Sequence, residues 1–135
     1  MTKMGVKYQG SLRTICTHYK SGDEITTDAP VDNHGKGEAF SPTDLLGASL
    51  ISCMITVMAI AAQNRGMAVG KMEGEVEKTM FSNPRRIGKL AIVLTIEDMG
   101  YTEKERAILD RAAIDCPVAL SLHPELEQDV TIKYV

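Results

Sequence analysis

An uncharged stretch of eighteen residues, 45–62, constrains this chain more than any other feature of its sequence. A helix that is apolar all round must be buried on every side or lie in a membrane. The chain has 135 residues, and a single domain of that size can hardly cover such a helix alone. The stretch therefore predicts a central helix that is wrapped by a sheet and by a second subunit.

The two ends of this helix are marked by residues with known capping preferences. Ser41 is a favoured N-cap, Pro42 fits the first helical position, and Asp44 lies where a capping box places its acid. Gly66 is a natural C-terminal stop. We therefore predict a helix over residues 41–65, which would be roughly 36 Å long.

A membrane span is the alternative explanation of the same stretch, because eighteen uncharged residues reach the lower edge of the transmembrane range. The neighbouring segments, however, read as strands of a soluble sheet, and neither side carries an excess of Lys and Arg. The first ten residues contain no apolar signal region. We therefore expect a cytoplasmic protein without a membrane partner.

Charge and ligand spacing exclude several other classes of function. The net charge is −3, without a block of like charges, so nothing favours binding to nucleic acid. Neither metal-ligand spacing nor a CxxC pair occurs among the histidines and cysteines, which are His18, His34, His123, Cys16, Cys53 and Cys116. We expect neither a metal nor a cofactor.

The remaining segments predict an α+β fold in one domain, residues 1–135. Alternating or β-branched residues indicate short strands, a Gly-rich stretch indicates a loop, and Thr102 with Glu105 has capping-box spacing. In chain order, the prediction is strands at 6–8, 12–15 and 24–27, a loop at 29–40, the long helix, a hairpin of 70–80 with 87–97, a helix from Thr102 to about Asp115, a helical turn at 118–122 and a strand at 129–135.

Two of the three cysteines lie where chemistry is conceivable. Cys53 is in the middle of the apolar helix, where a small buried hydrophobic residue is the simplest interpretation, and a thiolate there would need a nearby cation. Cys116 precedes Pro117 at a helix break, so its sulfur would lie near free N–H groups that favour thiolate. A capping and packing role for Cys116 is the alternative, and we interpret Cys16 as structural.

Two motifs carry a resemblance to a known family. The run FSPTDLL at 40–46, followed by Cys53, and the run CPV at 116–118, followed by Ser121 and Leu122, resemble the two signatures of the OsmC/Ohr family (osmotically inducible protein C and organic hydroperoxide resistance). The resemblance covers essentially the whole chain. It implies antiparallel sheets wrapped around a long central helix in an intertwined homodimer, with active sites at the dimer interface.

The resemblance also implies a function in oxidative-stress defence. In the family, the first cysteine attacks the peroxide and becomes a sulfenic acid, which the second cysteine captures as a disulfide. Carried over, Cys53 is the peroxidatic thiol and Cys116 the resolving thiol, and an external dithiol reduces the pair. A non-catalytic binding or redox-sensing protein of the same fold is the alternative.

The family site further uses an Arg from the N-terminal strands and a Glu just after the Pro of the first signature. Arg13 is the nearest match to the Arg, while the Glu position falls on Thr43, which cannot neutralise a guanidinium. The neighbouring Asp44, if it is not used as a cap, or Glu38 could supply the carboxylate. This departure indicates a divergent branch of the family.

Overall fold

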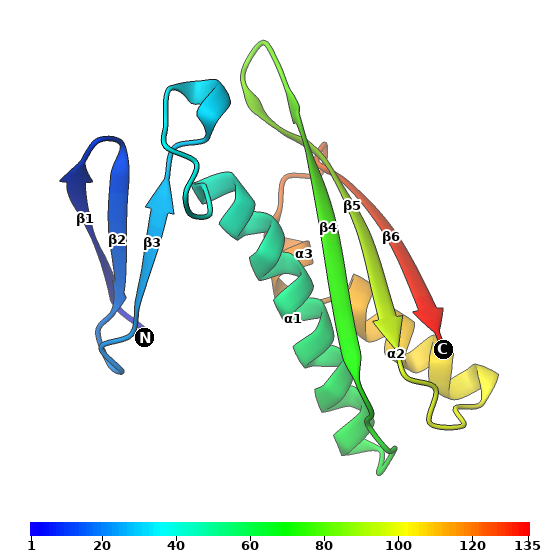
Figure 1. The fold of residues 1–135 in the computed structure, drawn as a ribbon. Helices are drawn as coiled ribbons and strands as arrows, with labels where there is room; N and C mark the ends of the chain where they lie inside the picture. Colours follow the sequence, from blue (N-terminus) through cyan, green and yellow to red (C-terminus); the bar gives the residue numbers. More distant parts are fainter. The chain divides into compact units, whose positions relative to one another are not determined.

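The structure is a computed structural model that describes residues 1–135, and it divides them into two compact units, residues 1–46 and 47–135. The predicted α+β class is confirmed, since each unit contains a three-stranded sheet and the chain adds three α-helices (Figure 1). The expectation of one domain over residues 1–135 stays a prediction.

The N-terminal unit is an antiparallel sheet in the order β1-β2-β3, followed by a loop with one 3-10 turn, η1. Its elements are β1 (Met4–Gly10), β2 (Arg13–His18), β3 (Glu24–Asp28) and η1 (Val31–Asn33). Its buried side chains, Thr27, Asp28 and Ser41, are all polar, whereas apolar residues of β1 are exposed. The apolar side chains of β1 therefore lie at the surface of this unit.

The long helix α1 (Pro42–Asn64) forms as its end signals predict. The Ser41 N–H donates to Asp44 Oδ2 at 2.9 Å, and the Asp44 N–H donates to Ser41 Oγ at 3.1 Å, which is a reciprocal capping box. Gly66 adopts a left-handed backbone with φ 64° just past the helix. Both predicted boundaries are therefore confirmed to within a residue.

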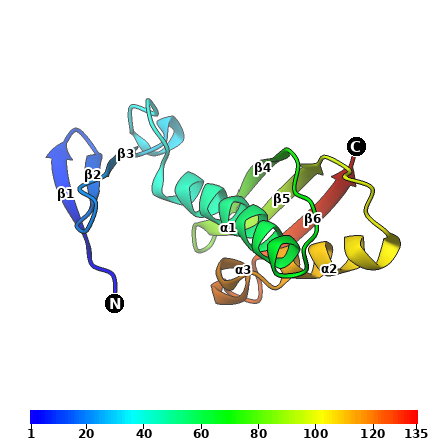
Figure 2. The ribbon, with the colours of Figure 1, turned by 90° about the horizontal axis from the view of Figure 1, so that it is seen from below.

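The C-terminal unit places its helices on one face of a mixed sheet (Figure 2). Its further elements are β4 (Met72–Phe81), β5 (Arg86–Ile96), α2 (Glu103–Ile114), α3 (Pro117–Ser121) and β6 (Glu127–Tyr134). The implied all-antiparallel arrangement is wrong here, because β6 pairs with β5 in parallel. The physical reason is the connection: α2 and α3 carry the chain back along the sheet, and such a crossover returns the next strand in the same direction.

The core of this unit lies between the sheet and one stripe of α1. Gly47 of the stripe faces Leu90 of β5 and Val76 of β4. The fully or nearly fully buried residues of α1, β5 and α2 are Gly47, Leu50, Met54, Met58, Ala62, Leu90, Ile92, Leu94, Ile96, Leu109 and Ala113. Their spacing on α1 is three or four residues, which is one helical face. Burial of this single stripe is what attaches α1 to the sheet.

The rest of α1 is not covered by its own chain. Only 28% of its most apolar eighteen-residue window is buried, and the opposite face exposes Ser49, Ser52, Thr56 and Ile60. By length and composition α1 could cross a membrane, although core helices of soluble proteins pass the same test. The expected burial on all sides is thus not achieved within one chain.

Candidate thiol site

Local structure positions the two candidate thiols on different helices of the C-terminal unit. Cys53 lies in the middle of α1, next to Met54 of the buried stripe. Cys116 is the N-cap of α3, with an extended backbone (φ −66°, ψ 150°) that Pro117 at the first helical position favours. The break between α2 and α3 therefore aims the Cys116 side chain into the unit.

The structure brings these two cysteines together. The Cys53 side chain lies close enough to the Cys116 thiol to raise the pKa of Cys116, and both residues are free thiols. Cys116 is 0% exposed, whereas Cys53 is partly exposed. Sixty-two residues lie between them in the chain, so this contact depends on the packing of α1 against the segment between α2 and α3.

The expectation that the helix start makes Cys116 a thiolate is wrong in its net effect. The Ala119 N–H does donate to Cys116 Sγ, at 3.4 Å, and this contact favours the charged form. Burial has the larger effect and raises the pKa of Cys116, and the adjacent Cys53 side chain raises it further. Cys116 is therefore a protonated thiol at neutral pH.

This raised pKa predicts slow alkylation of Cys116. With the reduced protein, we expect iodoacetamide to modify Cys116 at pH 7 more slowly than in the urea-unfolded chain, since a raised pKa lowers the thiolate fraction and burial blocks access to the sulfur. Labelling should accelerate only above about pH 8.5, the ordinary range for cysteine. Peptide mass spectrometry at each pH separates Cys116 from the other two thiols. Equal rates in the folded and unfolded chains at pH 7 would contradict the prediction.

Arg13 forms a compact ionic cluster within the N-terminal unit. Its Nε lies 2.7 Å from Asp28 Oδ1 and its Nη2 lies 2.8 Å from Asp28 Oδ2, a bidentate pair. Arg13 Nη2 also donates to Glu38 Oε2 at 3.2 Å. The guanidinium lowers the pKa of Asp28, mainly through these hydrogen bonds, and the two acids raise the pKa of Arg13.

Asp28 is the site residue that sequence reasoning missed. Its side chain is completely buried, and Oδ2 also accepts the Glu38 N–H at 3.1 Å, so it joins the loop to the sheet. The sequence held no clear signal for it, because the strand register that places Arg13 directly opposite Asp28 is known only from the folded sheet. The alternative that Glu38 contacts Arg13 is confirmed.

Thr43 and Asp44 lie at the start of α1. Asp44 accepts the Ser41 N–H as part of the helix cap, and Thr43 Oγ1 lies 3.1 Å from Ser41 Oγ. The cap thus engages the carboxylate that could have served Arg13. Arg13, Thr43 and Asp44 belong to the N-terminal unit, and Cys53 and Cys116 to the C-terminal unit.

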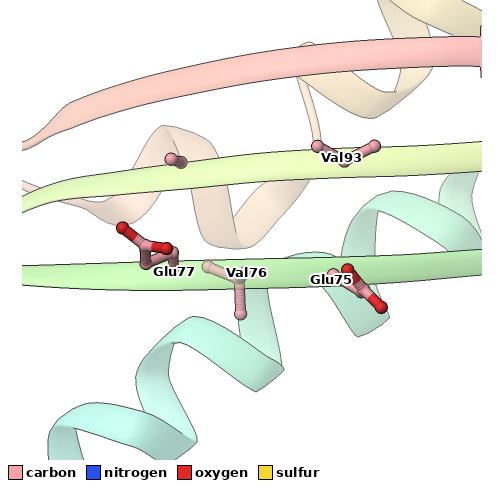
Figure 3. Close-up of a pocket in the computed structure, with 5 residues that line it drawn as sticks. Glu75, Val76, Glu77 and Val93 are labelled. Atoms are coloured by element: carbon pink, nitrogen blue, oxygen red, sulfur yellow. The ribbon is translucent and has the colours of Figure 1, made fainter.

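A surface pocket on the C-terminal sheet is not the thiol site. Figure 3 shows its lining on neighbouring β4 and β5, where Glu75 and Glu77 flank Val76, and Val93 lies on the adjacent strand. The depression has a volume of about 620 Å³ and is wide open to solvent. No cysteine lines it, so it contributes nothing to thiol chemistry.

The fold is α+β with a mixed sheet, and its helices hold two thiols next to each other. These features define a dithiol protein as the class. The family model of OsmC-like proteins matches residues 35–131, and this chain belongs to the OsmC-like family. Comparison with curated protein sequences gives no match.

Solved structures agree with the family assignment. A Psychrobacter arcticus protein, provisionally described as an osmotic stress induced and detoxification response protein, is 47% identical, with a TM-score of 0.91 over 98% of this chain and 96% of that one. An organic hydroperoxide resistance protein OsmC from Legionella pneumophila has the same fold at 15% identity, with a TM-score of 0.78 over 98% and 96% of the two chains. One from Elizabethkingia anophelis, with thiocyanate bound, matches at 13% identity and 0.78 over 100% and 96%.

Proposed function

We propose that the protein is a thiol-dependent peroxidase that reduces hydroperoxides in oxidative-stress defence. The observation that carries the proposal is the contact between a partly exposed thiol, Cys53, and a fully buried one, Cys116. The exposed member can meet a peroxide, and the buried member is protected from it while lying beside the oxidised sulfur.

The proposed reaction has two steps on the protein. The Cys53 thiolate attacks the terminal oxygen of ROOH, the O–O bond breaks, and the alkoxide takes up a proton and leaves as ROH, so that Cys53 becomes a sulfenic acid. The Cys116 sulfur then attacks the Cys53 sulfur, the S–O bond breaks, and hydroxide leaves with the Cys116 proton as water. The peroxide gains two electrons and the two thiols lose two.

An external dithiol completes the cycle in this proposal. Its thiolate attacks one sulfur of the Cys53–Cys116 disulfide, and its second thiol releases the mixed disulfide by exchange. The protein regains both thiols and the dithiol leaves oxidised. No metal or cofactor takes part.

The descriptions of the relatives support the proposed peroxidase function. Those from Legionella and Elizabethkingia are described as organic hydroperoxide resistance proteins, and the more similar Psychrobacter protein as a detoxification response protein. Arg13, by resemblance to the family Arg, would lower the pKa of the peroxidatic thiol and orient the peroxide, and its rigid pairing with Asp28 suits an orienting role.

Thiol and peroxide stoichiometry tests the proposal. One equivalent of an alkyl hydroperoxide should consume two thiols per chain and yield a Cys53–Cys116 disulfide, and added dithiothreitol should then sustain turnover. The second candidate function is that of a redox sensor. The raised pKa of Cys116 favours it, because a protonated thiol forms the disulfide with Cys53 slowly. A sensor would form the disulfide once but show no sustained peroxide consumption.

We also propose that the protein is a cytoplasmic homodimer in which the uncovered face of α1 packs against a second copy. The face is apolar or small, exposes Ser49, Ser52, Thr56 and Ile60, and carries no charge. Small residues of this kind let two helices approach closely. The exposed apolar residues of β1 supply further surface that a second copy would cover.

A charge on this face should therefore dissociate the dimer. We expect the wild type to sediment, without detergent, at twice the chain mass of 14.7 kDa, and Ile60→Glu to sediment as a monomer or unfold, because a buried unpaired carboxylate is strongly unfavourable. Ile114→Glu is the matched control: Ile114 is 49% exposed and Ile60 48%, yet Ile114 lies on α2. A compact wild-type monomer, or a dimer unaffected by Ile60→Glu, would rule out this interface.

A further inference from the structure

The helix that carries Cys116 is too short to hold its own position. α3 has five residues, and one turn of helix is marginal without tertiary support. A disulfide, in contrast, needs its two Cα atoms within about 7 Å and a narrow range of torsion. Whatever holds α3 therefore controls whether Cys116 can reach Cys53.

The side chain of Gln128 supplies such support from the neighbouring strand. Its Nε2 donates to the Ala119 carbonyl at 3.1 Å, and the Ala119 N–H donates to Cys116 Sγ at 3.4 Å. Ala119 is 7% exposed, so this contact lies at the buried side of α3. One residue of α3 thus links the Gln128 amide to the sulfur of Cys116.

The other end of this link is rigid. Gln128 lies on β6 opposite Leu90 of β5, and Leu90 is fully buried in the core of the sheet. Pairing between β5 and β6 therefore fixes the Cα of Gln128, and the side-chain amide of Gln128 connects α3 to the sheet. The first turn of α3 is also tied to α2, through the Cys116 N–H to the Ala113 carbonyl at 3.3 Å.

We propose that Gln128 is a positioning residue for the resolving thiol: its amide fixes α3 so that Cys116 faces Cys53, and it sets the rate of disulfide closure but not the rate of attack on the peroxide. The proposal rests on the proposed function and adds a residue to it. Gln128 touches neither peroxide nor sulfur, and it acts through Ala119.

The test substitutes the donor while keeping the size of the side chain. Gln128→Met removes the amide, and Gln9→Met, at an exposed position of β1, is the matched control. Both are compared with the wild type after circular dichroism has established that they fold. The rate of sulfenic acid formation is measured in a Cys116→Ser background, and the rate of closure by thiol titration and mass spectrometry in the presence of Cys116.

We expect Gln128→Met to close the disulfide about tenfold more slowly, which is the size of effect that loss of one orienting hydrogen bond produces. Sulfenic acid formation should stay within about twofold of the wild type. Cys53 should accumulate sulfinic acid in Gln128→Met, because its sulfenic acid lives longer. Equal slowing of both steps would indicate a merely structural role and overturn the proposal, as would an unchanged closure rate.

A second arm separates this proposal from the peroxidase itself. Oxidised glutathione forms a mixed disulfide at Cys53, which Cys116 resolves without any peroxide. Gln128→Met should slow that resolution by the same factor even if the wild type proves inactive towards hydroperoxides. An inactive wild type would refute the proposed function alone, and unimpaired resolution of the glutathione adduct would refute the role of Gln128.

Discussion

Replacing Cys53 with serine is expected to abolish hydroperoxide reduction, with kcat/KM lower by a thousandfold or more, on the order of what loss of a nucleophile costs other enzymes. A serine hydroxyl cannot be oxidised by a peroxide to a sulfenic acid analogue, so the first step is lost and not merely slowed. The measurement is peroxide consumption with dithiothreitol as reductant, using both hydrogen peroxide and an alkyl hydroperoxide.

Cys116→Ser and Cys16→Ser are the matched controls. With Cys116→Ser, the first turnover should proceed, and mass spectrometry should find sulfenic or sulfinic acid at Cys53, because the thiol that captures it is gone. Cys16→Ser should behave as the wild type, since Cys16 lies on β2 of the N-terminal sheet and is interpreted as a structural residue. Oxidation confined to Cys16 in the wild type would exclude Cys53 as the peroxidatic thiol.

Replacing Asp28 with alanine is expected to have the second-largest effect, a loss of about a hundredfold in kcat/KM, which is what misplacement of a catalytic group by roughly an ångström can cost. Asp28 holds the Arg13 guanidinium with two hydrogen bonds of 2.7 and 2.8 Å. Without it, Arg13 retains Glu38, whose side chain is 65% exposed and holds it weakly. The assay is kcat/KM for an alkyl hydroperoxide.

Glu38→Gln is the matched control for this prediction. It removes the exposed acid but leaves the buried bidentate pair, so its activity should stay within a few-fold of the wild type. If Glu38→Gln proves as damaging as Asp28→Ala, the exposed acid is the partner that matters. If neither change alters activity, Arg13 has no catalytic function.

The same pair predicts a dependence of stability on pH. The pKa of Asp28 is lower in the folded state than in the unfolded chain, so its pairing stabilises the fold fully above the unfolded value of about 3.9 and is lost as the pH falls through the lower, folded value. The thermal midpoint of the wild type should fall below about pH 4, and Asp28→Asn, which has no proton to gain there, should show a shallower decline. Parallel declines would show that other acids dominate.

Much of this structure could be predicted from the sequence because it depends on local interactions. The ends of α1 depend on Ser41, Asp44 and Gly66, which interact within a few residues of one another. The capping box that opens α2, between Thr102 and Glu105, is of the same kind. The two thiol motifs were visible because their residue runs resemble the two signatures of the OsmC/Ohr family. The helix caps need only short-range contacts, so the sequence alone determined them.

Only the tertiary structure decided the features that depend on residues far apart in the chain. The parallel direction of β6 follows from where α2 and α3 return the chain, and the pairing of Arg13 with Asp28 follows from strand register. The raised pKa of Cys116 is a balance in which burial outweighs the helix N–H, and burial is a property of the packed unit. The sequence determined that α1 is apolar on every side, and the tertiary structure decided which single stripe its own chain covers, because a sheet can bury only one face of a helix.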